Sequence, residues 1–114
     1  MIAYVEGKIL AKASTYIIIE TGGIGYKINT GSFPKGEAGQ VTKFFCFHYI
    51  REDTNELYGF SNNKDLELFE LFLTVSGVGP KVAQTIINLI TSFFFFKQKT
   101  AYDINTFKSV SGVG

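Results

Sequence analysis

The chain has 114 residues, of which 46% are hydrophobic and 18% are charged. This composition can supply a buried core and excludes a disordered chain. The formal net charge of +1 is too small to indicate a nucleic-acid partner by itself. A single cysteine, Cys46, excludes an internal disulfide and is expected to be a small core residue.

The apolar stretches are too short to cross a membrane. The longest, residues 86–96, is interrupted by polar residues and falls short of the roughly 20 residues that span a bilayer. At the start of the chain, Glu6, Gly7 and Lys8 interrupt any signal-peptide pattern. We therefore expect a cytoplasmic protein that does not contact a membrane.

The first 60 residues have the pattern of a small β-barrel. Runs of β-branched or alternating apolar residues predict strands, and glycine-rich segments predict the turns between them. Strands are expected over residues 2–11, 15–20, 24–29, 41–50 and 56–60. Five short strands in this length fit a barrel of the OB type, whereas a sandwich would need about seven.

The period of the apolar residues becomes helical after Ser61. Leu66, Phe69 and Leu73 recur at helical spacing. A serine or asparagine at the start of this segment can cap the helix by accepting a backbone hydrogen bond. The helix should end before Gly77, which interrupts the pattern.

A second helix is expected to begin at Pro80, because proline is tolerated in the first turn of a helix. Its apolar pattern continues to Ile90. Another short helix is expected within residues 103–114, leading into a second glycine turn. The predicted fold class is α+β, with a five-stranded OB-fold barrel over residues 1–62 and a helix-hairpin-helix domain over residues 63–114.

The segment between the two helices, residues 75–81, is a candidate phosphate-binding turn. Gly77 and Gly79 flank Val78, which can insert into the core while the glycine backbone approaches a partner. Exposed amides beside a helix N-terminus form an anion site, and Lys81 adds a positive charge. This is the layout of a helix-hairpin-helix motif, which holds DNA phosphates without reading sequence.

Part of this motif recurs as VSGVG at residues 110–114, which predicts paired contacts with the phosphates of one duplex. The candidate phosphate-binding residues are Ser76, Gly77, Val78, Gly79 and Lys81 in the first turn and Ser111, Gly112 and Gly114 in the second. The alternative is a tight turn between helices that holds no ligand. A Walker-type nucleotide site is excluded, because the chain contains no G-x-x-x-x-G-K-[ST] motif.

These segments together resemble the RuvA family, the Holliday-junction-binding subunits of the bacterial branch-migration complex. The resemblance covers nearly all of residues 1–92 and resumes near Asp103. It is carried by MIAYVEG over residues 1–7, IETGGIGY over 19–26, RED over 51–53, LYGF over 57–60 and VSGVGPK over 75–81.

The resemblance implies an OB-fold domain, a middle domain with two helix-hairpin-helix motifs and a C-terminal domain that contacts the RuvB ATPase motor. It also implies a homotetramer, or two stacked tetramers, that holds an open four-way junction in DNA recombination and repair. The RuvC resolvase is a further candidate partner.

The family's acidic pin corresponds to Glu52 and Asp53 in this chain. Carboxylates close to phosphates would push strands apart and discourage the binding of ordinary duplex. Without the resemblance, residues 51–53 would be interpreted as a charged hairpin tip.

No combination of side chains indicates catalysis. His48 has no ligand at metal-binding spacing, and no nucleophile and base can be paired. We therefore expect no catalytic residue, metal or cofactor. The alternative hypothesis is an OB-type module that binds single-stranded nucleic acid or a protein through an aromatic face at Phe45, Phe47 and Tyr49.

Two features depart from the family's pattern. Residues 93–102 read FFFFKQKTAY where the family has a polar amphipathic helix, and they resemble translated sequencing-adapter sequence substituted in place. Four consecutive phenylalanines cover the whole circumference of a helix, so an exposed apolar patch is expected. The sequence stops at Gly114, before a motor-contacting domain, so we expect weak junction binding and no stimulation of the motor.

Overall fold

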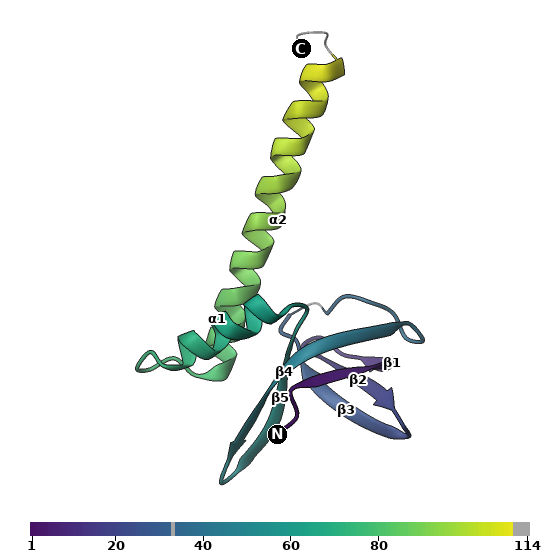
Figure 1. The fold of residues 1–114 in the computed structure, drawn as a ribbon, viewed down its shortest axis with the longest axis vertical. Coiled ribbons are helices and arrows are strands. Elements are labelled where there is room, and N and C mark those ends of the chain that lie inside the picture. Colours follow the sequence, from purple (N-terminus) through teal and green to yellow (C-terminus); the bar gives the residue numbers. More distant parts are fainter. Residues whose placement is uncertain (33, 111–114) are drawn as a thin grey trace.

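The computed structural model describes residues 1–32 and 34–110, which form a closed barrel of strands followed by helices (Figure 1). The strands are β1 Tyr4–Lys12, β2 Tyr16–Thr21, β3 Ile24–Asn29, β4 Val41–Arg51 and β5 Thr54–Phe60. The helices are α1 Asn63–Leu73 and α2 Pro80–Val110. The expected fold class, a β-barrel followed by helices, is confirmed.

The barrel closes in the strand order β1-β2-β3-β5-β4. Its strand pairs are antiparallel except for β3 and β5, which run parallel. A register shift between Ile9 and Ala11 forms an irregularity in β1. Apolar side chains fill the interior, namely Val5, Ile9, Ile17, Ile19, Ile28, Cys46 and Leu57.

A second apolar cluster lies between the outer face of β4 and β5 and the two helices. Phe69 of α1 is its most deeply buried aromatic residue, with 0% of its surface exposed. The buried members are Tyr58, Phe60, Leu66, Phe69, Ala83 and Ile87. Because strands and helices both contribute, this cluster holds the helices against the barrel.

Helix α1 begins and ends as its sequence predicts. The Asn62 side chain accepts a hydrogen bond from the Asp65 backbone N–H at 2.9 Å, which satisfies one of the free donors at a helix start. At the other end Thr74 is the C-cap residue, and its N–H donates to the Leu71 carbonyl at 3.1 Å. The α1–α2 turn, residues 74–79, therefore follows directly.

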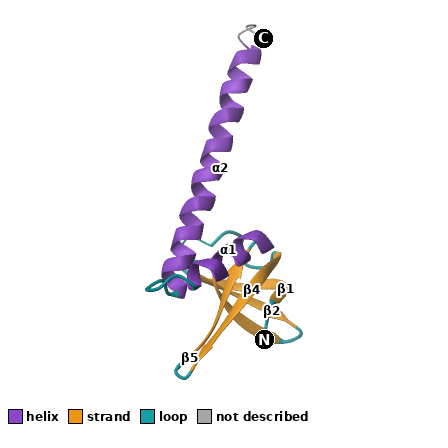
Figure 2. Cartoon of the chain, turned by 60° about the vertical axis from the view of Figure 1, so that its left-hand side comes forward, coloured by secondary structure: helices purple, strands orange, loops and turns teal. Residues whose placement is uncertain are grey.

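Helix α2 begins at Pro80 but continues without interruption to Val110. The expectation of a separate short helix from residue 103 is therefore wrong over residues 103–110. The reason is that residues 81–110 contain neither glycine nor proline, so nothing in this segment breaks the helix. Figures 1 and 2 show the far half of α2 projecting away from the barrel.

Two polar side chains attach the base of α2 to the end of β3. Gln84 is 4% exposed, and its Nε2 donates to the Asn29 carbonyl at 2.7 Å. One turn later, Asn88 Nδ2 donates to the Thr30 carbonyl at 3.2 Å. Asn29 in turn donates through Nδ2 to the Leu57 carbonyl at 3.0 Å. These bonds fix where α2 leaves the barrel.

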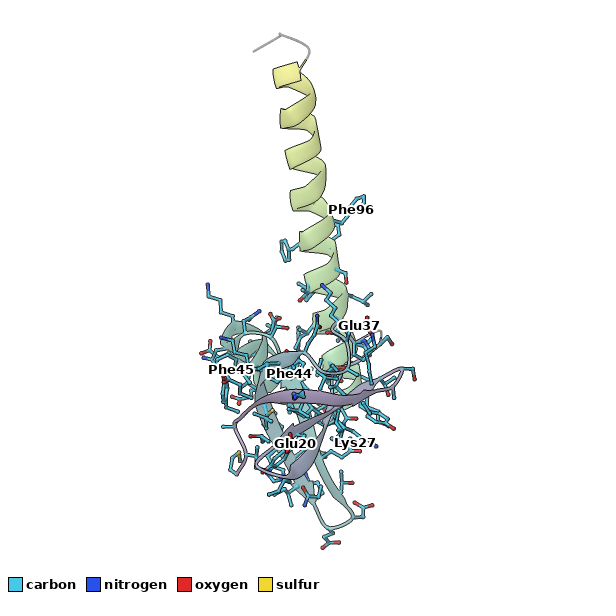
Figure 3. All side chains as sticks on the ribbon, turned by 90° about the vertical axis from the view of Figure 1, so that its right-hand side faces the viewer. Glu20, Lys27, Glu37, Phe44, Phe45 and Phe96 are labelled. Atoms are coloured by element: carbon cyan, nitrogen blue, oxygen red, sulfur yellow. The ribbon has the colours of Figure 1, made fainter. Side chains whose placement is uncertain are left out.

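The phenylalanine segment lies on the part of α2 beyond the barrel. Phe93, Phe94 and Phe96 are 60%, 59% and 67% exposed, and Figure 3 shows Phe96 well clear of the barrel. The expected exposed apolar patch is confirmed. Within the described residues, none of the helices is long and apolar enough to cross a membrane.

Candidate nucleic-acid interface

The α1–α2 turn presents free backbone amides beside the N-terminus of a long helix. Val75 N–H donates to the Phe72 carbonyl at 3.0 Å, and Val78 N–H donates to the Val75 carbonyl at 3.1 Å. Within the part of the chain that the structure describes, the N–H groups of Gly77 and Gly79 donate to no backbone carbonyl. These amides are available to an anion.

The residue types of this turn explain its shape. Gly77 has φ +85°, in the left-handed region that favours glycine. Val78 packs against the second apolar cluster, whereas Ser76 is exposed. A Cβ atom at Gly77 or at Gly79 would meet nothing within 4 Å. Val78 therefore anchors the turn from the protein side, while the backbone at the two glycines is open to a partner.

Lys81 lies in the first turn of α2 and is exposed. Ala83 N–H donates to the Gly79 carbonyl at 3.0 Å, so the helical bonding pattern starts at Gly79. The first amides of a helix have no partner within the helix, and this end carries partial positive charge. The Lys81 ammonium adds to the positive potential at the same end.

The structure brings together all the candidate residues of the first turn. Ser76, Gly77, Val78, Gly79 and Lys81 are contiguous between the end of α1 and the first turn of α2. The candidates of the second turn, Ser111, Gly112 and Gly114, lie outside the described residues.

Glu52 and Asp53 form the exposed two-residue tip of the β4–β5 hairpin. Arg51 pairs with Thr54 across the base of this tip, and the Thr54 hydroxyl donates to Asp53 Oδ1 at 3.2 Å. In Figures 1 and 2 the hairpin extends out of the barrel, and its tip lies on the same side of the molecule as the α1–α2 turn. One side therefore presents both open amides and two carboxylates.

The aromatic residues of β4 do not form an open binding face. Phe45, Phe47 and Tyr49 pack against the second apolar cluster. The Phe47 ring centroid lies 5.4 Å from that of Phe69, and the Tyr49 centroid lies 6.4 Å from that of Tyr58. These rings are occupied by packing within the protein, so this arrangement disfavours the aromatic single-strand interface considered from the sequence.

Burial raises the pKa of two side chains, Cys46 and Tyr58. Burial raises the pKa of the Cys46 thiol to about 11, and Cys46 is 3% exposed, as expected for a core residue. Burial and a hydrogen bond from the Tyr58 hydroxyl to Glu56, at 2.8 Å, raise the pKa of Tyr58. Among the described residues, no group of three or more His, Cys, Asp or Glu side chains could hold a metal ion.

Two contributions to this interface were missed in the sequence. Gln84 and Asn88 share the buried face of α2 with Ile87. Polar residues on this apolar face could have indicated that their side chains bond to another element, here the end of β3. Phe69 was placed in the apolar repeat of the first helix, but nothing local indicates that it contacts the β4–β5 hairpin. That contact depends on the tertiary fold.

A closed five-stranded barrel followed by two helices with an open turn between them defines an OB-fold protein with a helical extension. Residues 1–59 match the family described as RuvA N terminal domain. The chain belongs to this family.

Curated relatives extend the similarity beyond the barrel. The chain is 37% identical over 117 positions to a protein of Acetivibrio thermocellus, 38% over 117 to one of Ruminiclostridium cellulolyticum and 32% over 116 to one of Flavobacterium psychrophilum. Each comparison covers all of this chain and 58%, 59% and 60% of the relative, respectively. Each relative is named Holliday junction branch migration complex subunit RuvA. The chain thus spans about three fifths of their length.

Proposed function

We propose that this chain binds four-way DNA junctions without reading their sequence, as the RuvA subunit of a branch-migration complex. The observation that carries the proposal is the position of the open α1–α2 turn and the acidic tip on one side of the molecule. The names of the relatives point to the same substrate.

In this proposal the α1–α2 turn holds a DNA phosphate. The free N–H groups of Gly77 and Gly79 donate to phosphate oxygens, and the N-terminus of α2 and Lys81 supply positive potential. Phosphates are the same at every base pair, so this contact positions the protein without specifying a sequence.

The acidic tip selects the shape of the DNA. A carboxylate 4 Å from a phosphate is repelled by about 1 kcal/mol in bulk water and by about 4 kcal/mol where the effective dielectric constant is 20. Continuous duplex laid across Glu52 and Asp53 meets this repulsion. An open junction has a centre without stacked base pairs, where the tip fits between the separating strands.

The remaining parts of the proposal concern the assembly. Residues 1–62 form the barrel domain and residues 63–114 belong to a helix-hairpin-helix domain, in which Ser111, Gly112 and Gly114 contribute a second phosphate contact. The subunit is non-catalytic, uses no cofactor and acts in the cytoplasm in recombination and repair. Four copies surround one junction, and the partners are the RuvB motor, through a domain present in the longer relatives, and the RuvC resolvase.

Fluorescence anisotropy with three labelled DNAs tests the proposal. The 114-residue chain is titrated into a four-way junction, a duplex of the same sequence and a single strand, at one fixed salt concentration. We expect about tenfold or greater preference for the junction over the duplex, equivalent to about 1.4 kcal/mol. Equal affinity for all three DNAs contradicts the proposal, and a preference for the single strand favours the alternative OB-type module.

A further inference from the structure

Among the strands of the described residues, none pairs with the outer part of the β4–β5 hairpin. β4 pairs with β1 only over residues 41–45, and β5 pairs with β3 only at Leu57 and Tyr58. Residues 49–51 and 54–56 pair only with each other. Because an isolated two-stranded hairpin is marginally stable in water, other contacts must hold the acidic tip in place.

An aromatic row on one face of the hairpin supplies these contacts. Its innermost residue is Phe69 of α1, which is fully buried. The Phe69 ring centroid lies 5.4 Å from that of Phe47, 5.6 Å from that of Tyr58 and 4.9 Å from that of Phe60. These separations fall in the range of favourable aromatic pairs. Both strands of the hairpin are therefore joined to α1 through one side chain.

Tyr49 extends the row toward the tip. Its ring centroid lies 6.4 Å from that of Phe47 and 6.4 Å from that of Tyr58, edge-on to the latter. The Arg51 guanidinium carbon stands 4.3 Å from the centroid of the Tyr49 ring, a cation–π contact. The same guanidinium donates to the Ile50 carbonyl at 2.8 Å. The row thus runs from α1 to the residue immediately before the tip.

The α1 helix also determines the position of the phosphate-binding turn. Phe69 lies one helical turn before Leu73, where α1 ends and the α1–α2 turn begins. We infer that Tyr49 is a positioning residue, which through Phe69 and Arg51 fixes the distance between the acidic tip and the α1–α2 turn. This inference rests on the proposed function, since a fixed distance matters only if both features contact one DNA.

The opposite face of the hairpin offers a matched control. Ile50 is adjacent to Tyr49 in the sequence, points away from the aromatic row by the alternation of a strand and is 51% exposed. Ile50→Ser therefore replaces a large apolar side chain by serine, as Tyr49→Ser does, at nearly the same distance from the tip but on the opposite face of the hairpin. Tyr49→Phe keeps the ring and should restore what Tyr49→Ser loses.

Spin-label distances test the positioning role without DNA. Labels are attached to Glu52→Cys at the tip and Ser76→Cys in the turn, both exposed positions. Cys46 is buried with a pKa of about 11, so it forms little thiolate at neutral pH and should remain unlabelled. Double electron–electron resonance then gives the distribution of distances between the two labels.

We expect a narrow distribution of label-to-label distances in the chain that carries only the two labelled cysteines. The same narrow distribution is expected when Ile50→Ser or Tyr49→Phe is added. Tyr49→Ser should broaden it, and Arg51→Gln, an exposed change that leaves the rings intact, should broaden it less. If Tyr49→Ser does not fold by circular dichroism, Arg51→Gln provides the test. If the distance distribution of Tyr49→Ser, or that of Arg51→Gln where Tyr49→Ser does not fold, is as narrow as that of the Ile50→Ser control, the inference is overturned.

The DNA measurement links position to specificity. In chains without labels, Tyr49→Ser should lower the ratio of junction to duplex affinity by about threefold to tenfold, the effect of one lost aromatic pair, while duplex affinity changes little. An unchanged ratio in Tyr49→Ser overturns the inference. If the original chain itself shows no preference for junctions, the proposed function fails, and the spin-label widths still decide whether Tyr49 fixes the tip.

Discussion

At Gly79 a Cβ atom would meet no other atom within 4 Å, and its φ lies outside the left-handed region, so alanine fits the folded chain. In the proposed complex, the added methyl group would stand where a phosphate approaches the amide. We expect Gly79→Ala to lower the free energy of unfolding by less than about 1 kcal/mol, the usual cost of alanine at the start of a helix. Affinity for junction and duplex should fall about tenfold in anisotropy titrations.

Gly77→Ala serves as the comparison for this variant. At φ +85° an alanine is strained by about 1–2 kcal/mol, which urea denaturation measures as lost stability. Gly77→Ala combines this strain with obstruction at a phosphate-binding amide, so only a loss of affinity without loss of stability in Gly79→Ala isolates obstruction of the ligand. Wild-type affinity in Gly79→Ala would place the phosphate contact away from this turn.

In the proposed complex, Lys81 contributes positive charge to the phosphate contact and does not recognise the base sequence. We expect Lys81→Gln to weaken binding to junctions of different sequence by the same factor and to reduce the slope of log affinity against log salt by about one. The matched control is Lys27→Gln. Lys27 lies on β3, which Figure 1 shows on the opposite side of the barrel from the α1–α2 turn. Its ammonium stands 4.4 Å from the centroid of the Tyr16 ring. An equal loss of affinity in both variants would indicate a non-specific effect of charge.

The α1–α2 turn could be predicted from its residue types, because each of these residues determines the conformation of the chain at its own position. Gly77 supplies a positive φ, Val78 supplies an apolar anchor and Pro80 starts a helix. The roles of Gln84 and Tyr49 could not be predicted in the same way. Their partners lie on other elements, and no local rule specifies which carbonyl or ring a side chain will meet.

At the scale of elements, strands were predictable where the pattern was regular. The alternation over residues 24–29 gives β3 with the same bounds. The first strand, expected over residues 2–11, is observed as Tyr4–Lys12, and the register shift between Ile9 and Ala11 could not be seen in the sequence. The end of α2 was missed because its apolar pattern was followed only to Ile90 and a separate helix was expected from residue 103, whereas the helix continues to Val110.

The attachment of α2 to the barrel depends on Gln84. Gln84→Ala removes a buried donor and leaves the partly buried Asn29 carbonyl without its 2.7 Å partner. We expect a loss of about 1–3 kcal/mol in the free energy of unfolding, the cost of an unsatisfied buried acceptor. The control is Thr85→Ala, the exposed neighbour, for which the change should be within about 0.5 kcal/mol. If urea denaturation gives the same loss of unfolding free energy for Gln84→Ala and Thr85→Ala, the hydrogen bond is not the cause.

At the scale of the whole molecule, α2 makes the chain elongated, with principal extents of 62 × 39 × 21 Å. The middle of α2, beyond its contact with the barrel, carries Phe93, Phe94 and Phe96 in exposed positions. Such a patch favours association, so we expect concentration-dependent self-association in sedimentation velocity. Replacing the three phenylalanines together with glutamate should suppress it, whereas Thr91→Ser, on the same helix, should not. Equal association of the original chain and the triple variant would contradict this expectation.

The global properties of the chain give no indication of DNA binding, because its net charge is only +1. Binding in this account comes from one turn and selectivity from one hairpin tip, and the relative position of the two is a property of the tertiary structure. The sequence alone could identify each feature. It could not show that they lie on one side of the molecule, since that depends on how α1 packs on β4 and β5.

In the proposed complex the amides of the α1–α2 turn bind phosphates, and the acidic tip selects junctions over duplex. The decisive measurement is the ratio of junction to duplex affinity in the chain with Glu52→Gln and Asp53→Asn combined, determined by anisotropy beside the original chain. These changes remove two exposed charges and retain the side-chain shapes. We predict that junction affinity stays the same or rises while duplex affinity increases about tenfold or more, so that the preference collapses. An unchanged preference for the junction would contradict the account.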